Sequence, residues 1–493
     1  MKIQRLVLMG TALFLASGLL LLIAVPTADA IPAFSRKYRT SCATCHVAFP
    51  KLNAFGEAFR NNGYRMPGGD EDYLADDPVS LGAEPWKRLW PEAIWPGDIP
   101  YLPPVAFYVD NTYVVEPGAE INNDFLFPNN VALLTGGTFG STFSFYGRIN
   151  VFAPGQDLHI HRFFGQANDL GTNLLNVRFG QMEPRAIPFS SSRSLIAGDY
   201  LINAQTFPLR EWLEAHESGG GHVEEGAGGG EHLHGGDFAL GSTQKGIELW
   251  GATTGFGGKG GFEYGVGVVN GNGSGAFGGT GRNDNNSSKD TYGRAAYKFG
   301  GLSLLGDPEN APAQSNNWRD DSLTVGVFGY RGSAPFMLMG ENEGEEMHGM
   351  VNSEAALLAM QEGDEEDDHG TAMLMGDERY NRFGVDFDFW FRDLNLFGAY
   401  MRGETRLDPL SADHATAEFT SWFTEADYVI YPWLIGALRY EQVDLPQPMN
   451  DIERWTPHVT ALIRANVKFT FDAELHPKEG VRNRYFFNFA FAF

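Results

Sequence analysis

The chain has very little cysteine and few basic residues. Its 493 residues include only two cysteines, and 36 Lys and Arg stand against 62 Asp and Glu, a formal net charge of −26. This balance argues against a nucleic-acid-binding protein and favours cationic partners or an acidic exposed surface. Gly (61 residues) and Phe (38 residues) are instead abundant, a mixture that is typical of a β-rich protein with wide loops.

Both cysteines belong to one motif, Cys42-x-x-Cys45-His46. Cys-x-x-Cys-His is the attachment signature of a c-type haem, in which each thiol adds to a vinyl group and the histidine ligates the iron. A zinc site would need further Cys or His ligands nearby, and no histidine follows His46 before His159. A thioredoxin-like pair would be expected in a βαβ context. We therefore predict one covalent haem c, with no cysteine left for a disulfide framework.

The N-terminus reads as an export signal that covers residues 1–30. Lys2 and Arg5 precede a long apolar run, and Ala28-x-Ala30 forms a cleavage site. The run is long enough to be a membrane anchor, but no basic stop-transfer cluster follows it. Export agrees with a c-type haem, which is attached outside the cytoplasm.

Residues 31–69 are predicted to form a small helical unit around the haem. The residues expected to pack on the haem recur at spacings of three and four and predict one helical stripe: Phe49, Leu52, Phe55 and Phe59. Met66 is the candidate for the second axial ligand of the iron, because it is the only methionine between the motif and the first strand. A Met that merely fills space beside the porphyrin, or a barrel-wall ligand from His159 or His161, is the alternative. Residues 70–102, rich in Pro and Trp, are predicted to be a linker.

From residue 103 to residue 493 the apolar residues recur every second position. In residues 385–391, for example, Val and Phe alternate with Asp386 and Asp388, and the chain ends with Phe at every second position from Phe487 to Phe493. Bulky apolar side chains opposite charged ones, strand after strand, indicate a transmembrane barrel with a lipid-facing and a lumen-facing surface. Sixteen strands are predicted, near residues 103, 125, 141, 157, 172, 237, 260, 288, 321, 379, 395, 417, 433, 456, 467 and 483.

The predicted connections alternate between short and long, as in barrels with short periplasmic turns and long outer loops. The two longest outer loops are expected at 183–236 and 334–378. Within the second, residues 341–378 hold thirteen Asp and Glu, no Lys or Arg, and two histidines. Such residues ligate divalent metals, although acidic, Gly-rich outer loops are commonly just solvated. Enrichment of cations near the loops is expected without any fixed metal site.

Residues 32–66 resemble the haem segment of the fused outer-membrane cytochrome-porins. The resemblance rests on Cys-x-x-Cys-His followed by P-x-L-x-x-FG-x-x-FR-x-NGY, which runs from Pro50 to Tyr64. Over the barrel it is general, and the loops carry none of it. It implies an Fe(II)-oxidising protein, and hence a possible Fe(II):cytochrome c oxidoreductase activity. Iron as the donor is implied by the resemblance alone.

The sequence thus predicts a mainly β protein: an antiparallel barrel of about sixteen strands in the bacterial outer membrane, with a small helical monohaem domain in its lumen or at its periplasmic side. The expected function is electron transfer from an extracellular donor, Fe(II) by resemblance, to a periplasmic c-type cytochrome, with outer-membrane lipid as the other partner. Two alternatives remain open: an outward electron conduit, and a solute porin with an accessory haem domain. The oligomeric state is not predicted.

Overall fold

A computed structural model describes residues 33–70, 79–80, 98–99, 105–139, 142–153, 158–204, 233–234, 238–271, 286–307, 316–340, 372–408, 416–446, 449–478 and 480–493. The predicted signal peptide lies outside these residues, as does nearly all of the predicted linker, of which only Asp70 and the pair β3 (Val79–Ser80) and β4 (Asp98–Ile99) are described. No helix in the described residues is long and apolar enough to cross a bilayer.

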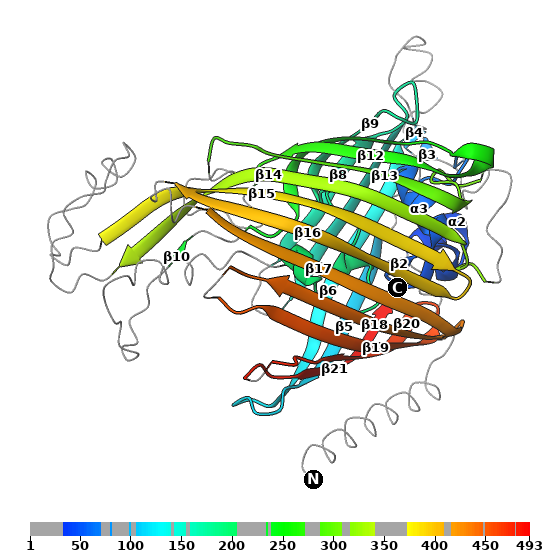
Figure 1. The fold of residues 1–493 in the computed structure, drawn as a ribbon. Helices are drawn as coiled ribbons and strands as arrows, with labels where there is room; N and C mark the ends of the chain where they lie inside the picture. The colour runs from blue at the N-terminus through cyan, green and yellow to red at the C-terminus, as the bar shows by residue number, and fades with distance from the viewer. Residues whose placement is uncertain are drawn as a thin grey trace.

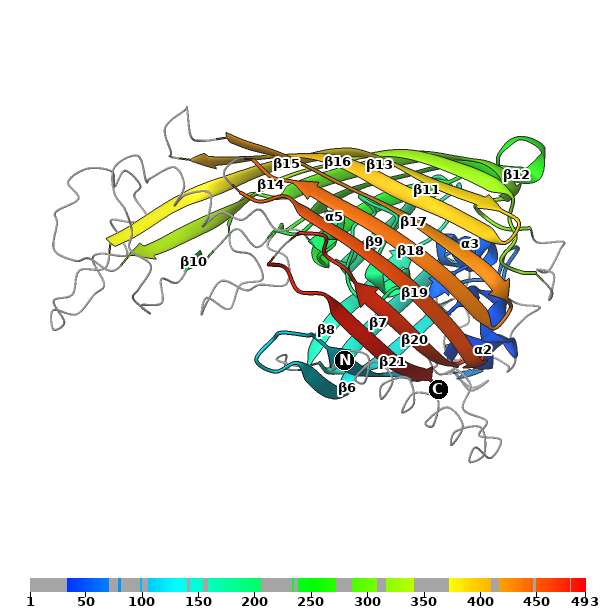
Figure 2. The same ribbon diagram turned by 60° about the horizontal axis from the view of Figure 1, so that its bottom comes forward.

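Sixteen antiparallel strands form a closed barrel, in which each strand pairs with its neighbours in the chain and the last pairs with the first. Figures 1 and 2 show the strands tilted around a common lumen. The strands are β5 (Val105–Val115), β6 (Asn123–Phe139), β7 (Phe143–Phe152), β8 (His159–Ala167), β9 (Asn176–Met182), β11 (Gln244–Ala252), β12 (Lys259–Val269), β13 (Asp290–Leu302), β14 (Ser322–Gly340), β15 (Ala372–Phe391), β16 (Leu394–Asp408), β17 (Thr416–Tyr431), β18 (Leu434–Asp444), β19 (Ile452–Arg464), β20 (Val467–Glu474) and β21 (Arg484–Ala492). The predicted number of strands is confirmed. Fourteen of the sixteen strands begin within four residues of a predicted position, whereas β11 and β15 begin seven residues away from theirs.

The barrel closes between its first and last strands. Phe487 is the register partner of Tyr113 across β21 and β5, and the backbones of Phe107 and Phe493 exchange two hydrogen bonds of 2.7 and 2.9 Å. Closure satisfies the backbone groups that an open sheet edge would leave unpaired in lipid.

Side chains alternate around the wall with the charged ones inside. On β18, Arg439 and Glu441 are 1% and 0% exposed, whereas Leu438 between β17 and β19 is 44% exposed. The predicted pattern of residues 385–391 is likewise observed: Val385 is 47% exposed and Asp386 is 4% exposed. Polar residues inside and apolar residues outside is the arrangement of a barrel that spans a membrane.

Two predicted outer loops are corrected. β14 and β15 continue as a paired ladder through Gly340 and Ala372, so residues 334–340 and 372–378 are strands and project beyond the rest of the barrel (Figure 1). A ladder that is already in register can continue past the bilayer wherever the backbone groups still pair. The second correction concerns residues 183–204, which belong to the connection between β9 and β11, as predicted, but fold inward, as described below, instead of staying outside the barrel.

Residues 183–204, called the inner segment below, fold inside the barrel. It contains a 3-10 turn, η2 (Ser191–Arg193), and a short helix, α5 (Leu201–Ala204). Its main chain binds the wall: Leu201 N donates to Glu441 Oε1 at 2.8 Å, and Arg454 Nη2 donates to the Asp199 carbonyl at 2.8 Å. Tyr200 and Ile202 join the apolar core of the lumen with Phe423 of β17.

Residues 33–70 form an N-terminal unit that also lies inside the barrel. The unit consists of α2 (Ala33–Tyr38), the 3-10 turn η1 (Cys42–Thr44), the pair β1 (His46–Ala48) and β2 (Lys51–Leu52), and α3 (Ala54–Asn61). It sits at the end of the barrel opposite the projecting β14 and β15 (Figures 1 and 2). The connections at that end include the two-residue turns 392–393, 432–433 and 465–466, and short turns mark the periplasmic side.

Candidate haem-binding site

Polar contacts to the barrel wall hold the N-terminal unit in the lumen. The Lys51 ammonium is buried, forms an ion pair with Asp427 of β17 and donates to Asn395 Oδ1 of β16 at 2.5 Å. At the other side of the unit, Tyr64 stacks on Tyr146 of β7 with ring centroids 5.0 Å apart. Residues 47 and 48 also pack beside Leu195 of the inner segment. The unit is therefore enclosed by the wall and the inner segment together.

The two cysteines lie in and just after η1, in a loop fixed by Asn53. Both thiols are free. The Asn53 backbone N donates to the Cys45 carbonyl at 3.0 Å, and Asn53 Nδ2 donates to the Thr44 carbonyl at 3.1 Å. Asn53 Oδ1 accepts from Gly56 N at 2.9 Å and caps α3. A single side chain thus joins the cysteine loop to the start of the helix.

Gly56 lets α3 approach the cysteine loop closely. A Cβ at this position would lie 2.1 Å from the Cys45 carbonyl oxygen, which is inside any permitted contact. The glycine of the Phe-Gly pair in the sequence is thus required by packing against the motif itself.

The imidazole of His46 is oriented by the backbone. Its Nδ1 lies 3.2 Å from the Pro50 carbonyl oxygen, so Nδ1 carries the proton and Nε2 keeps its lone pair. Burial lowers the pKa of His46 despite this hydrogen bond, which favours the neutral ring. A neutral histidine with one nitrogen held by a backbone carbonyl is the usual form of a metal-binding histidine.

Burial also keeps the two thiols protonated. It raises the pKa of Cys42, and burial together with the neighbouring Cys42 raises the pKa of Cys45 to about 12. A protonated thiol is a poor nucleophile in exchange reactions, so this environment does not suit a thiol–disulfide redox pair.

The structure brings together only part of the predicted haem-packing set. Phe55 and Phe59 project from α3 into a buried cluster with Met66 and Tyr38, and Cys45 packs against that cluster. Met66 therefore shares an apolar cluster with one cysteine of the motif. Its backbone N donates to Asp70 Oδ1 at 2.9 Å, which fixes the turn after α3.

Phe49 and Leu52 do not belong to the predicted helical stripe. α3 begins only at Ala54, after its cap Asn53, so both residues precede it. Phe49 packs on Tyr108 of β5, with ring centroids 6.3 Å apart, and Leu52 pairs with His46 in the β1–β2 ladder. Phe49 and Leu52 have helical spacing in the sequence but lie in a turn and a strand, because α3 starts only after its capping residue Asn53.

The two wall histidines take part in polar contacts on the wall. His159 Nε2 lies 3.2 Å from Asn150 Nδ2, and His161 Nε2 lies 3.4 Å from Arg162 Nη2. Throughout the described part of the chain, no group of three or more His, Cys, Asp or Glu is placed to hold a metal ion. The acidic residues 341–371, where loop ligands were considered, lie outside the described residues.

Several residues of the site were not found by sequence reasoning. The N-cap position of Asn53 had a local signal, since Asn directly before a stretch with helical periodicity is a capping residue. Lys51 and Asp70 had none, because their partners depend on the fold: Asp427 for Lys51, and Lys37 and Tyr38 for Asp70.

The comparisons with known proteins show no family for this chain. No protein-family model matches the chain, and no curated protein matches it. Among solved structures, in-vitro folded OmpT of Vibrio cholerae (trimer form) is similar at 9% identity and a TM-score of 0.46, over 80% of this chain and 99% of that one. OmpF of Salmonella typhi, in complex with daunomycin, is similar at 11% identity and a TM-score of 0.44, over 79% of this chain and 97% of that one.

The barrel itself defines the class of protein. A closed sheet of sixteen antiparallel strands with apolar residues outside and charged residues inside is a porin-like β-barrel of the outer-membrane type. Within this class, the present chain differs from a plain barrel in carrying the N-terminal unit and the inner segment inside its lumen.

Proposed function

We propose that the chain is an outer-membrane electron-transfer protein that carries one haem c on Cys42 and Cys45, with His46 as the proximal ligand. The observation that supports this most strongly is the placement of the Cys-x-x-Cys-His segment inside the barrel, with the His46 imidazole oriented by the Pro50 carbonyl at 3.2 Å. A cofactor inside the lumen can exchange electrons with both sides of the membrane more readily than one hanging below it.

The chain's own residues supply what such a cofactor needs. The two free thiols stand three positions apart for covalent attachment, and His46 offers Nε2 to the iron. Phe55, Phe59 and Met66 form the buried apolar surface beside Cys45, which would exclude water from the ring. A bound haem would supply reversible one-electron chemistry.

The proposed direction is inward, from an extracellular donor to a periplasmic c-type cytochrome. Fe(II) is proposed as the donor on the resemblance of residues 32–66 to the cytochrome-porins. The net charge of −26 is consistent with it, since an acidic protein raises the local concentration of cations. Oxidation at the outer side would also keep insoluble ferric product out of the periplasm.

The donor is tested by stopped-flow mixing of the haem-loaded protein with Fe(II) while the haem spectrum is followed. Reduction of the haem over the pH range tested is the expected result. If Fe(II) never reduces it, the iron-oxidising function is wrong. A measured potential well below that of usable ferrous complexes would instead favour the outward conduit.

Met66 is proposed as the distal ligand of the iron. The variant Met66→Ala is expected to lower the reduction potential and to lose a sulfur-to-iron charge-transfer band, because a thioether raises the potential of a histidine-ligated haem. Met182, which is buried on β9, provides a matched control as Met182→Leu. An unchanged spectrum in Met66→Ala would reject the ligand.

A solute porin with an accessory haem domain is the second candidate. The porin-like barrel favours it, whereas the two segments packed in the lumen oppose a wide path. Swelling of proteoliposomes in small sugars would support the porin, and haem reduction without swelling would support electron transfer.

A further inference from the structure

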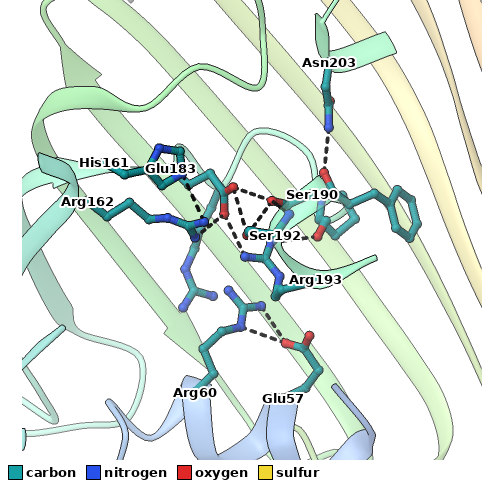
Figure 3. Close-up of polar contacts among 12 residues, drawn as sticks. Glu57, Arg60, His161, Arg162, Glu183, Ser190, Ser192, Arg193 and Asn203 are labelled. Atoms are coloured by element: carbon teal, nitrogen blue, oxygen red, sulfur yellow. Dashed lines mark hydrogen bonds and ion pairs between the residues drawn. The ribbon is translucent and has the colours of Figure 1, made fainter. Parts of the chain in front are cut away.

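A cavity lies between the N-terminal unit and the inner segment, away from the cysteines. It is a partly open cavity of about 50 Å³, lined by Arg60 and Tyr64 of the N-terminal unit and by residues of the range 183–193 of the inner segment. In Figure 3, Arg60 and Glu57 rise from α3 toward the group formed by Arg162, Glu183 and Arg193. The cavity is thus where the two segments in the lumen face each other.

Arginine dominates its lining. Two glutamates, Glu183 and Glu263, line it together with six arginines, which are Arg60, Arg162, Arg178, Arg185, Arg193 and Arg294. Glu57, Glu248 and Asp386 reach some of these guanidinium groups from outside the lining. Even with these three counted, six cations meet five carboxylates, so the cavity retains positive charge.

The carboxylates are shared, which leaves the guanidinium groups incompletely paired. Glu183 Oε2 contacts Arg162 at 3.1 Å and Arg193 at 2.7 Å. Glu248 Oε1 contacts Arg178 at 2.8 Å and Arg185 at 3.3 Å. Each pair of arginines therefore has one carboxylate in common.

Two buried donors on the lining have no acceptor. The Nε atoms of Arg162 and Arg178 are inaccessible to solvent and make no hydrogen bond, whereas Arg185 Nε lies 3.3 Å from Glu248 Oε1. Buried donors are almost always satisfied. Planar guanidinium groups with free N–H bonds match the oxygens of carboxylates and phosphates better than they match any neutral ligand.

We propose that this cavity binds a small oxyanion group, a carboxylate or a phosphate. Two sources carry that chemistry: a free anion that enters the lumen, and the carboxylates of the haem proposed for the neighbouring motif. Both sources are compatible with the lining, because its residues Arg60 and Tyr64 belong to the same N-terminal unit as the haem motif. The site stands on the cavity itself and does not depend on the electron-transfer function.

Inorganic phosphate is the probe. The full-length protein in detergent is titrated with phosphate by calorimetry at constant chloride, beside the double variant Cys42→Ala/Cys45→Ala, which cannot attach haem. Equal binding to both proteins identifies a free anion as the ligand. Binding to the double variant alone identifies the haem carboxylates as the ligand, because in the wild type they already occupy the cavity and exclude phosphate. If the purified wild type carries no haem, the two proteins behave alike, so failure of the haem proposal is recognised from the absorption spectrum.

The variant Arg185→Gln tests the residues. It is expected to weaken phosphate binding about tenfold, which corresponds to about 1.4 kcal/mol, and Arg185→Lys should restore part of it by keeping the charge. Arg402→Gln is the matched control, since its side chain is 62% exposed and pairs with Glu418 away from the cavity. Arg193→Gln replaces Arg185→Gln if the latter fails to fold, as judged by heat-modifiable migration. Lack of phosphate binding by both the wild type and the double variant overturns the proposal, as does undiminished binding by the arginine variants.

Discussion

At the scale of single residues, the substitution Gly56→Ala has two effects of opposite sign on the stability of α3. Helix propensity alone predicts that Gly56→Ala stabilises α3 by about 1 kcal/mol. Packing predicts the reverse, because the new Cβ would lie 2.1 Å from the Cys45 carbonyl oxygen, and forced overpacking costs about 1–3 kcal/mol. We expect the clash to win, since backbone atoms cannot move aside as a side chain can.

Hydrogen exchange of residues 42–61 measures the outcome. Gly56→Ala should lose protection there, and Ala54→Gly, at a half-buried position of the same helix, should lose only the propensity contribution. A gain of protection in Gly56→Ala would mean that α3 does not pack on the cysteine loop as described.

The residues of the candidate site differ in how far the sequence could reveal them. Cys42, Cys45 and His46 could be named as candidates from the sequence because the haem-attachment signature is contiguous. Phe49 and Leu52 were assigned to a helix because spacing alone does not show where a capping residue starts one. The partner of Lys51 was out of reach, since Asp427 is 376 residues away in the sequence and only closure of the barrel brings them together.

At the scale of elements, the strands were predictable because the period-two pattern is imposed by lipid on one side and by the lumen on the other. The inner segment was not. Residues 183–204 show no regular alternation in sequence, and what holds them inside is pairing with wall residues such as Arg439, which donates to Ser194 Oγ at 2.8 Å. No local sequence pattern indicates such distant partners.

Glu183 makes the inner segment sensitive to acid. Burial raises the pKa of Glu183, but the neighbouring Arg162 and Arg193 outweigh burial and hold its pKa below the ordinary value of 4.5. A carboxyl group with a lowered pKa stabilises the fold fully above its ordinary value and loses that contribution as the pH falls below it. We expect residues 183–204 to lose hydrogen-exchange protection as the pH falls from 5 through 4.5 and below.

Glu183→Gln should remove this pH dependence and lower protection at neutral pH, because Arg162 and Arg193 lose their shared carboxylate. The matched control is Glu418→Gln, at an exposed position paired with Arg402, which should behave as the wild type. An unaltered acid transition in Glu183→Gln would show that other groups hold the segment.

At the scale of the whole molecule, the described residues fill the lumen from two directions. The N-terminal unit occupies the end with the short turns, and the inner segment is anchored by hydrogen bonds on β18, β19 and β20. The two segments also contact each other through residues 47, 48 and 195. A barrel of this size without such segments conducts ions through an aqueous channel, so we expect the single-channel conductance of the wild type in planar bilayers to be far below that of an open sixteen-stranded porin.

Lys51 offers a way to release the N-terminal unit without shortening the chain. Its ion pair with Asp427 is buried on both sides, and Lys51→Met leaves an uncompensated carboxylate, which costs about 3–5 kcal/mol. We expect Lys51→Met to raise the conductance or the frequency of open events, because the unit loses a buried ion pair with the wall. Lys51→Met/Asp427→Asn removes both charges and should return the conductance toward the wild-type level, and Arg402→Gln on the outer surface should leave it unchanged. A wild-type conductance equal to that of an open porin would show that the packed segments leave a wide path beside them, and the solute porin would then become the better account of this barrel.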